Sequence, residues 1–495
     1  MESYGFLSVL PPVLAILLAI RTKQVYVSLV FGIGLGWLIL SHWNPWVGFL
    51  NTIEAFVNVF QSRGNTRTIM FSALVGSLIV LIQRSGGVHG FIDGVERYLE
   101  RLEGRDIQHK RRFVQMLAWL VGVIVFVETS ISSLTVGTLF RPIFDKLHIS
   151  REKLAYIADA SSAATSIMIP FNAWGAFIMG LLITQGFDEP FTAMFRSMPY
   201  NFYPILTLAM VPILVWWSLD FGPMKKAELR ANTTGRVIAD GAKPMISEDL
   251  LHFEPVEGKP RRMMNMLIPI GVMVGMMPVM LSITGWQDAV IANPDAGTFA
   301  TIFTAIGKGS GSTSVLVSVI LAILVSMLLY WGQRLMGFLE MVELSIKGLS
   351  NMMPLALLML LAFAIGAVCK SLGTGQYVAE VAKSWLSPAL VPAIVFVVSA
   401  FIAFSTGTSW GTFAIMIPIA VPMAQTLDVN VYMAIAAALG GGVYGDHSSP
   451  ISDTTIISSM ASASDHIDHV NTQMPYALVA GGISVVLYLI LGFIQ

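Results

Sequence analysis

The sequence predicts an all-α polytopic membrane protein of two inverted repeats, each with five transmembrane helices, a re-entrant hairpin and a broken helix. Three observations predict this fold. Only 12% of the 495 residues are charged, against about 25% in a typical soluble protein. The apolar residues gather in twelve long segments. The order of these segments, and several of their residues, recur in the second half of the chain.

The composition excludes several classes of protein. A mean hydropathy of +0.72 excludes a soluble enzyme, because only a hydrocarbon solvent tolerates a surface with so few charges. A net charge of −1 without a long basic run predicts no nucleic-acid partner. The single cysteine, Cys369, excludes an internal disulfide and a Cys-rich metal site.

The apolar segments are the predicted membrane spans, since a helix needs about 20 apolar residues to cross a bilayer. The first half offers residues 6–20, 25–41, 68–83, 113–140, 154–185 and 199–217. The second half offers residues 265–283, 315–332, 353–369, 389–424, 431–460 and 475–494. Residues 6–20 lack the basic start and the small-residue cleavage site of a signal peptide, so we expect a retained span.

Two of the segments, 113–140 and 389–424, are too long for one crossing and are interrupted by small polar residues. We interpret both as re-entrant hairpins whose tips stop inside the membrane, where protein or a water-filled cavity must surround the exposed backbone groups. The first tip holds Glu128, Thr129, Ser130, Ser132 and Ser133. The second tip holds Thr406, Gly407, Thr408 and Ser409.

The distribution of Lys and Arg predicts the orientation. If the N-terminus lies outside and both hairpins return to the side they left, 23 of the 29 basic residues are cytoplasmic and 6 are outside. This is a strong positive-inside bias, and it predicts a multi-pass protein of the bacterial inner membrane. Residues 218–262, with 8 basic and 7 acidic side chains, would be a cytoplasmic linker between repeats at 1–217 and 263–495.

The two halves share an apolar stripe on one helix face, repeated at an offset of 286 residues. Its members are Phe49, Ile53, Phe56 and Phe60, and then Leu335, Leu339, Val342 and Ile346. Each stripe predicts an interfacial helix along the membrane surface. Five crossings in the first half start the second half on the opposite side, so the repeats would be inverted. Inverted repeats with broken helices are typical of secondary transporters, and a chance likeness of apolar helices explains the shared order poorly.

Charged residues at membrane depth are the first candidates for function, because they are costly there. Four acids fall inside the predicted spans or tips: Glu128, Asp159, Asp446 and Asp453. No Lys or Arg within the spans is available to pair with them, so a bound cation or a proton would have to neutralise each one. A site that alternates between these two states is a cation/proton exchanger in outline.

The densest polar cluster lies at residues 445–454, where Pro450 should break the helix because it has no N–H. The freed carbonyls and the nearby side chains would form the all-oxygen surroundings that hard cations prefer. The side chains are those of Asp446, Ser449, Ser452, Asp453 and Thr454, with Na⁺ expected at Asp446 and Asp453. The first repeat offers a counterpart in Asp159 and a break at residues 170–172, which ends on Asn172.

Structural roles stay open for several of these residues. Ser and Thr in membrane helices often bond only to their own backbone or allow close packing, which applies to Ser161, Ser162 and Thr165. Glu128 could cap a helix at the hairpin tip. His447 could relay protons, because imidazole titrates near neutral pH, or it could act as a hydrogen-bonding residue alone.

Residues 445–455, GDHSSPISDTT, resemble the signature of the NhaC-type Na⁺/H⁺ antiporter family. The resemblance extends over essentially the whole chain, although only this motif is highly specific. It implies the ion transporter superfamily fold of inverted repeats with two re-entrant hairpins. The family pattern has Cys where this chain has Ser448. Serine is similar in size to cysteine, and its hydroxyl oxygen is a better ligand for a hard cation. The family also includes carriers of organic acids and amino acids. The resemblance therefore implies Na⁺ coupling more firmly than it implies the identity of the transported solute.

Two functions follow from these observations. The first is Na⁺/H⁺ antiport by alternating access, in which Asp446 and Asp453 bind Na⁺ or protons in turn and Glu128 and Asp159 offer a second site. The alternative is a Na⁺-coupled carrier of a small amino acid or organic acid, held by the hairpin tips and Asn172. A channel fits poorly because the hairpins block a continuous pore. Na⁺, H⁺ and the bilayer are the expected partners, a homodimer is a further option, and no cofactor is expected.

Overall fold

The computed structural model describes residues 4–22, 24–100, 107–126, 129–244, 256, 258–292, 294, 297–383 and 386–494. Every regular element in these ranges is a helix, and the one β-bridge is an isolated pair between Pro244 and Asp465. This agrees with the predicted all-α class.

The first half of the chain forms eleven α-helices and two short 3-10 helices within the described ranges. The elements are η1 Gly5–Val9, α1 Leu10–Thr22, α2 Val25–Leu40, α3 Pro45–Gln61, α4 Arg63–Arg84, α5 Gly87–Glu100, α6 Ile107–Ile124, α7 Thr129–Lys146, α8 Arg151–Met168, α9 Ala173–Thr184, α10 Pro190–Ser197, η2 Met198–Tyr200 and α11 Phe202–Trp217.

The predicted linker contains α12, and the second half forms the remaining helices. The elements are α12 Gly222–Thr234, α13 Met264–Ala292, α14 Thr298–Lys308, α15 Gly311–Gly332, α16 Phe338–Leu372, α17 Thr374–Lys383, η3 Pro388–Leu390, α18 Val391–Thr406, α19 Ser409–Thr426, α20 Val431–Ser448, α21 Asp453–Ser462 and α22 His466–Ile494. Short helices such as α5, α10, α14 and α17 fill intervals that the sequence left between spans.

Long apolar helices dominate the molecule. Among the described residues, six helices are long and apolar enough to cross a membrane, or up to eight if each bent helix pair counts as one span. Exposed apolar side chains lie along the outer helices, for example Ile283 on α13 and Phe493 on α22. An exposed apolar surface of this extent is stable only against lipid, so the chain is a multi-pass membrane protein.

Both predicted hairpins contain a helix–turn–helix break where the small polar residues lie. α6 ends at Ile124 and α7 begins at Thr129, while α18 ends at Thr406 and α19 begins at Ser409. Glu128 lies outside the described residues. Gly407 ends α18 with a φ of +70°, a left-handed conformation that glycine adopts without a steric penalty. That the two tips stop within the bilayer stays a prediction.

Two further helices are interrupted where the sequence predicts it. α8 and α9 meet at a 41° bend, and Asn172 starts α9 by accepting a hydrogen bond from the backbone N–H of Gly175 at 3.1 Å. α20 ends at Ser448 and α21 begins at Asp453. Pro170 and Pro450 lie in these two breaks, since proline cannot donate the hydrogen bond that would continue a helix.

The second interfacial helix is a wrong prediction. The first stripe forms a separate helix, α3, with Phe49 and Phe60 exposed, but the second belongs to the loop before α16 and to the continuous 35-residue helix α16 itself. The difference lies at Ser62, whose extended backbone and hydroxyl end α3 and cap α4. At the same offset of 286 residues the second half has Gly348, which has no side chain to form a cap.

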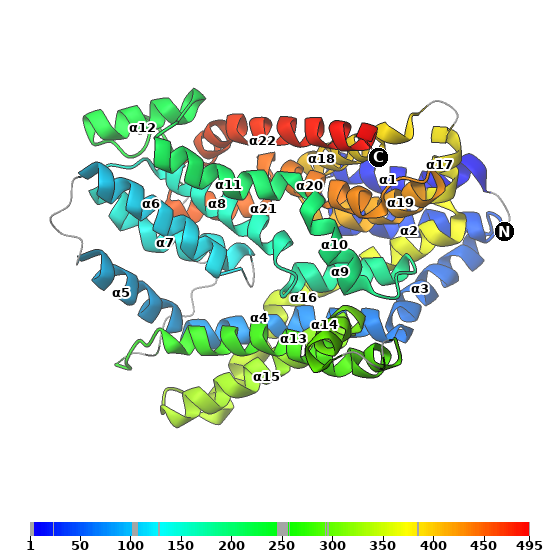
Figure 1. Cartoon of the computed structure of the whole chain (residues 1–495), viewed down its shortest axis with the longest axis horizontal. Coiled ribbons are helices and arrows are strands. Elements are labelled where there is room, and N and C mark those ends of the chain that lie inside the picture. Colours follow the sequence, from blue (N-terminus) through cyan, green and yellow to red (C-terminus); the bar gives the residue numbers. More distant parts are fainter. Residues whose placement is uncertain are drawn as a thin grey trace.

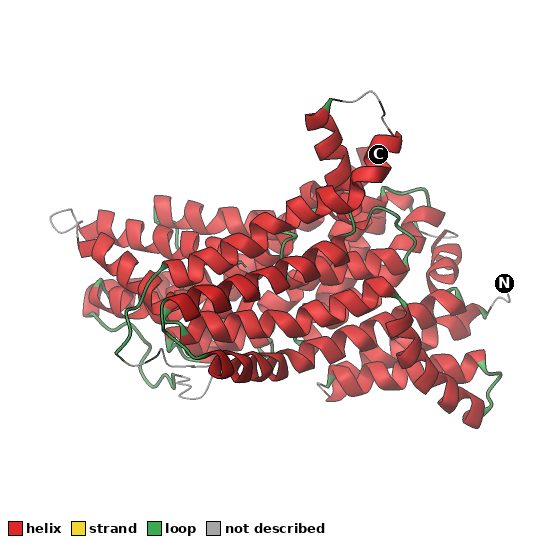
Figure 2. Ribbon diagram, turned by 90° about the horizontal axis from the view of Figure 1, so that it is seen from below, coloured by secondary structure: helices red, strands yellow, loops and turns green. Residues whose placement is uncertain are grey.

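The broken helices lie in the middle of the molecule. In the view of Figure 1, α8, α20 and α21 lie below α22 and above α4 and α13. α21 packs against α7 and α8, and α22 packs against α8 and α20. Figure 2 shows the helix bundle turned by 90°, with long helices running side by side. The helices on either side of the two breaks are therefore enclosed by other helices of the bundle.

Contacts between connecting segments separate them into two groups that match the predicted sidedness. Predicted cytoplasmic segments touch one another, as Arg111 and Glu228 do in an ion pair of 3.0 Å. Predicted outer segments also touch one another, as Lys308 and Glu189 do at 3.2 Å. The Lys370 ammonium likewise donates to the Thr184 carbonyl at 2.8 Å. Which group faces the cytoplasm stays a prediction.

The linker helix α12 is fixed to the bundle. Glu228 on α12 accepts hydrogen bonds from the backbone and hydroxyl of Ser150 at 2.8 and 2.7 Å. Arg230 donates to the Glu152 carboxylate at 2.8 Å, and Glu152 is buried. Because removing one partner of a buried ion pair leaves the other charge uncompensated, these pairs hold α12 against the start of α8.

Helices α4 and α16 approach so closely that only glycine fits at their crossing. A Cβ atom added to Gly348 would lie 2.3 Å from the Gly76 carbonyl oxygen, and one added to Gly76 would lie 2.1 Å from the Gly348 carbonyl oxygen. The Ser77 hydroxyl donates to the Ser345 carbonyl at 2.7 Å across the same contact. Small residues that let backbones touch are the usual basis of helix packing in membranes.

We therefore expect Gly348→Ala to destabilise the protein by about 1–3 kcal/mol, because the added methyl group must push two backbones apart. The control is Gly275→Ala on α13, where an added Cβ meets nothing within 4 Å and alanine should favour the helix. Thermal unfolding of the detergent-solubilised protein, followed by tryptophan fluorescence, measures both. Equal unfolding midpoints for the two variants would contradict the close contact between α4 and α16.

Candidate functional site

The candidate site lies where the two helix breaks meet the two hairpins. In the first half, the Asn172 amide donates at 3.1 Å to the carbonyl of Phe126, which lies in the turn after α6. In the second half, the Ser449 hydroxyl donates to the Phe404 carbonyl near the end of α18 at 2.7 Å. Each break is thus tied to its own hairpin by one side-chain hydrogen bond to a backbone carbonyl.

Asp446 is the central acid of the second half. Its side chain is 2% exposed, and both of its carboxylate oxygens accept hydrogen bonds from hydroxyl groups. Ser452, in the break, donates to Oδ1 at 2.6 Å, and Ser409, at the hairpin tip, donates to Oδ2. Ser452 also contacts the Thr454 hydroxyl at 3.0 Å. The hairpin and the break therefore supply one hydroxyl donor each to the same carboxylate.

Asp453 occupies a different environment from Asp446. We expected both carboxyls to be buried, but Asp453 is exposed and accepts a hydrogen bond from the backbone N–H of Thr454 at 2.8 Å. It is the first residue of α21, where an acid is favoured by the unpaired N–H groups of the helix. It lies close enough to Asp446 for electrostatic interaction. The pair thus consists of an inner and an outer acid.

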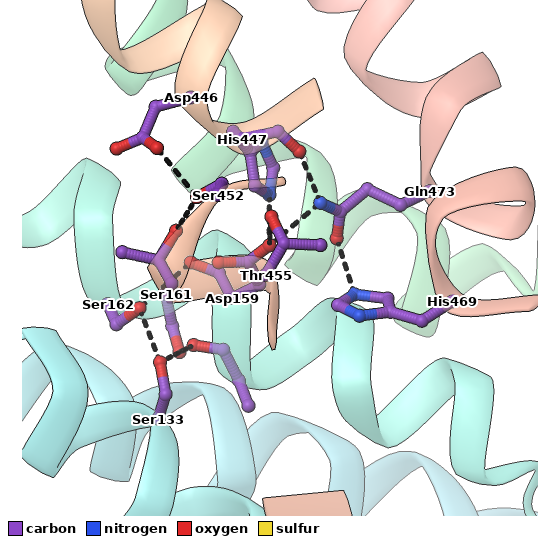
Figure 3. Close-up of polar contacts among 12 residues, drawn as sticks. Ser133, Asp159, Ser161, Ser162, Asp446, His447, Ser452, Thr455, His469 and Gln473 are labelled. Carbon is purple, nitrogen blue, oxygen red and sulfur yellow. Dashed lines mark hydrogen bonds and ion pairs between the residues drawn. The ribbon is translucent and has the colours of Figure 1, made fainter. Parts of the chain in front are cut away.

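Asp159 on α8 is the buried acid of the first half and is 0% exposed. Its Oδ2 atom accepts hydrogen bonds from the Gln473 amide at 2.8 Å and from the Thr455 hydroxyl at 3.2 Å. Its Oδ1 atom has no hydrogen-bond partner among the described residues. Figure 3 shows Asp159, His447 and Gln473 pointing toward one another from three different helices.

His447 follows Asp446 on α20, and its ring faces Asp159. Its Nδ1 atom is 2.6 Å from the Tyr203 hydroxyl, and its backbone carbonyl accepts from the Gln473 amide at 2.5 Å. Its Nε2 atom is 3.8 Å from Oδ2 of Asp159 and has no hydrogen-bond partner in the described part of the chain. The imidazole therefore faces Asp159 across a gap that is slightly too long for a direct hydrogen bond.

Other tip side chains donate to backbone carbonyls or to a serine of α8. Ser132 donates to the Gly122 carbonyl at 2.9 Å, and Ser133 donates to the Ser162 hydroxyl at 2.8 Å. Thr406 donates to a carbonyl of its own helix at 2.8 Å, and Thr408 is the N-cap of α19. Thr129 is buried, whereas the side chain of Ser130 lies outside the described residues. Ser409, in contrast, donates to a carboxylate, that of Asp446.

The two buried acids of the site, Asp446 and Asp159, have no Lys or Arg partner among the described residues. Among the described residues, no Lys or Arg forms an ion pair with Asp446 or Asp159; buried Lys153 pairs with Asp220 instead, and Arg111 pairs with Glu228. The described chain also holds no group of three or more His, Cys, Asp or Glu side chains placed to bind a metal ion. Any cation here would be held by one or two carboxylates together with hydroxyl and carbonyl oxygens, as hard cations allow.

Several residues of the cluster were not predicted from the sequence. They are Tyr203, Thr455, His469 and Gln473. The signal for two of them was present, because His469 and Gln473 are four residues apart and share a helix face. The predicted span began only at residue 475, whereas α22 begins at His466. The polar first turns of α22 therefore looked like a loop.

Comparison with known proteins gives a family and a fold. A sequence model of the Na⁺/H⁺ antiporter family matches residues 176–493. An uncharacterized protein of Haemophilus influenzae is 33% identical over 98% of this chain and 91% of its own length. The arginine/ornithine antiporter ArcD of Halobacterium salinarum is 29% identical, over 29% of this chain and 31% of its own length.

Among solved structures, the YdaH transporter of Alcanivorax borkumensis has a similar fold. The TM-score is 0.54 at 15% sequence identity, and the match covers 90% of this chain and 89% of that one. At this identity the likeness shows the fold alone.

The left-handed turn at Gly407 offers a test of the contact between hairpin and break. A Cβ atom added to Gly407 would lie 2.6 Å from the Ile451 carbonyl oxygen. Gly373 is the matched control, because its φ of +68° is nearly the same but its nearest neighbour would be a side-chain atom 3.7 Å away. At either position, alanine would adopt a left-handed backbone conformation that costs about 1–2 kcal/mol. Only Gly407→Ala also brings its Cβ atom into a clash with the Ile451 carbonyl oxygen.

We therefore expect Gly407→Ala to lower the thermal unfolding midpoint in detergent clearly more than Gly373→Ala does. Equal losses would show that the hairpin tip does not pack against the α20–α21 break as described.

Proposed function

Because the chain belongs to the Na⁺/H⁺ antiporter family, we propose that it exchanges Na⁺ for H⁺ across the bacterial inner membrane. The family membership makes it a membrane transporter rather than an enzyme. The proposed orientation has the N-terminus outside and the 218–262 linker in the cytoplasm, which follows the positive-inside bias. The proton gradient would then drive Na⁺ outward.

One observation supports the exchange more than any other: among the described residues, two buried carboxylates face only neutral donors and one histidine. Asp446 is bonded by two hydroxyl groups, and Asp159 by a hydroxyl and an amide. An uncompensated buried charge costs several kcal/mol, so each carboxylate must bind either a cation or a proton. A carboxylate that can bind a cation or a proton, but not both at once, couples the movement of the two in opposite directions.

We assign Na⁺ to Asp446, with the hydroxyls of Ser409, Ser452 and Thr454 as further oxygen ligands. Asp453, which is exposed and near Asp446, would receive the ion or proton first. Ser409 belongs to the α18–α19 hairpin and Ser452 to the α20–α21 break. A displacement of the hairpin relative to the break would therefore change the number of oxygens around the ion, as alternating access requires.

Asp159 and His447 form the proposed second proton site. The imidazole Nε2 and the carboxylate Oδ2 are 3.8 Å apart, and each group has a nitrogen or oxygen atom without a hydrogen-bond partner among the described residues. A proton on either group would create a donor for the other. The contribution of Glu128 stays a prediction, because this residue lies outside the described ranges.

A second candidate function is Na⁺-coupled transport of a small amino acid or organic acid. The name of the ArcD relative supports it, since that protein is an arginine/ornithine antiporter. The starts of α9 and α19 also approach each other, with the rings of Trp174 and Trp410 at 5.1 Å between centroids. Two half-helix N-termini could hold a carboxylate through their free backbone N–H groups.

Asp446→Asn tests the proposed Na⁺ site. The substitution removes the charge but keeps the shape, so we expect Na⁺-dependent dissipation of an imposed pH gradient in proteoliposomes to fall at least about 100-fold. The control is Asp288→Asn, a change at an exposed acid of α13, which should transport as the wild type does. Normal transport by Asp446→Asn would contradict the site, and an inactive wild type would contradict Na⁺/H⁺ exchange.

A solute screen separates the two candidate functions. Proteoliposomes are loaded with Na⁺ or with choline and supplied with radiolabelled amino acids and organic acids. Na⁺/H⁺ exchange predicts that no solute accumulates and that proton flux needs Na⁺ alone. Accumulation of one solute that stops when choline replaces Na⁺ would favour the carrier function instead.

A further inference from the structure

A continuous row of hydrogen-bonded side chains leads from the start of α22 to the buried acid Asp159. His466 Nε2 is 2.6 Å from the Pro450 carbonyl, and its Nδ1 is 3.0 Å from the Ser459 hydroxyl. The same hydroxyl is 2.8 Å from Nδ1 of His469. His469 Nε2 is 2.9 Å from Oε1 of Gln473, whose amide nitrogen donates to Asp159.

The hydrogen bonds of Gln473 determine the protonation of His469. The Gln473 amide nitrogen lies 2.8 Å from the Asp159 carboxylate and 2.5 Å from the His447 carbonyl, and both of these oxygens act as acceptors. The other amide atom, Oε1, therefore faces His469 Nε2 and can only accept. His469 must therefore carry a hydrogen on Nε2. Figure 3 shows the contact between His469 and Gln473.

His466 is constrained in the same way from the other end. Its Nε2 atom faces the Pro450 carbonyl, which can only accept, so Nε2 must carry a hydrogen. A neutral imidazole has one hydrogen on its two nitrogens. If both rings are neutral, each therefore presents a bare Nδ1 atom to the same hydroxyl group, that of Ser459.

The Ser459 hydroxyl has one hydrogen and cannot satisfy both rings. It can donate to Nδ1 of one histidine, or to the Thr455 carbonyl at 2.8 Å, but a second bare nitrogen is then left facing an oxygen lone pair. One additional proton resolves the conflict, because a doubly protonated ring donates from Nδ1 to the Ser459 oxygen. Ser459 then donates its own hydrogen to the other ring, and every contact in the row is a hydrogen bond.

We propose that His466, Ser459 and His469 form a proton-transfer site that holds one shared proton and passes it between the two rings. With the proton on His466, the His466 Nδ1–H bond breaks as the Ser459 oxygen accepts that proton. The Ser459 O–H bond breaks as Nδ1 of His469 accepts the second proton. The positive charge moves from His466 to His469, the serine is regenerated, and no other reactant is needed.

The surroundings give the site an outer and an inner position. His466 is partly exposed, beside Asp465, whereas His469 is 0% exposed. Burial raises the pKa of Asp465, but the backbone N–H groups of Lys243, Asp468 and Ile467 and the His466 ring lower it more, so the net pKa lies below its usual value. Asp465 is therefore anionic at neutral pH and stabilises a proton on His466.

The other charged and titratable groups near the site are few among the described residues. Asp159 on α8 and His447 on α20 face His469, and Asp468 lies beside Asp465 and interacts with Arg230 of α12. A proton on His469 would place a positive charge one amide away from Asp159. This charge favours the ionised form of Asp159, so the inner position of the shared proton controls the state of the buried acid.

This proposal deepens the proposed proton coupling and rests on it, but its first test does not require transport. Nitrogen NMR of ¹⁵N-histidine-labelled protein in nanodiscs reports the protonation of each ring. At the pH of the transport assay, we expect one imidazolium and one neutral ring at His466 and His469. We expect it to disappear in both His466→Gln and Ser459→Ala.

Ser458→Ala is the matched control, because Ser458 is the neighbouring buried serine of α21 and its hydroxyl has no hydrogen-bond partner among the described residues. It should leave the imidazolium signal unchanged. Two neutral rings or two imidazoliums at His466 and His469 in the wild type at that pH, or a signal that survives in Ser459→Ala, would overturn the shared proton even if the protein transports.

The second test measures transfer. We expect Ser459→Ala to slow proton-coupled flux in proteoliposomes at least about tenfold, as loss of a positioned proton-transfer group does, while Ser458→Ala keeps the wild-type rate. An unchanged rate in Ser459→Ala would overturn the transfer step. If the wild type itself shows no proton flux, the proposed function fails, whereas the NMR result still decides whether the two histidines share a proton.

Discussion

The structure depends on one constraint: carboxylates are enclosed among helices without a Lys or Arg beside them in the described chain. Asp446 and Asp159 are both buried, and neutral hydroxyl and amide groups donate all of the hydrogen bonds that their side chains accept from described residues. Neutral donors stabilise a carboxylate less than a cation does, so these sites can accept either a metal ion or a proton. A permanent ion pair, such as that between Arg111 and Glu228, could not alternate in this way.

The arrangement also shows why the helices are interrupted. The oxygens around Asp446 come from two different elements, the hairpin with Ser409 and the break with Ser452, rather than from one rigid helix. In the first half, Asn172 in the break likewise bonds to the carbonyl of Phe126 in the turn after α6. Elsewhere the bundle is tightly packed, as at the contact between Gly76 and Gly348. Motion is therefore expected at the breaks and hairpins and not at the α4–α16 contact.

The sequence predicted those features that depend on local chemistry. Pro450 and Pro170 indicated helix breaks because proline cannot donate a hydrogen bond, and the small polar runs indicated the hairpin turns. Prediction from the sequence failed where the burial of a residue depends on how distant helices pack. Asp453 is exposed although it is only seven residues from Asp446, because its side-chain direction depends on how α21 starts after the break. The polar first turns of α22 looked like a loop, since burial by neighbouring helices cannot be read from local hydropathy.

The most direct test of this account is whether Na⁺ and protons compete for the same buried carboxylate. Purified protein in weakly buffered detergent solution is mixed with Na⁺, and the released protons are counted with a pH indicator. The account predicts proton release that saturates with Na⁺ and is absent in Asp446→Asn. Binding of Na⁺ without proton release, or equal release from Asp446→Asn, would contradict it.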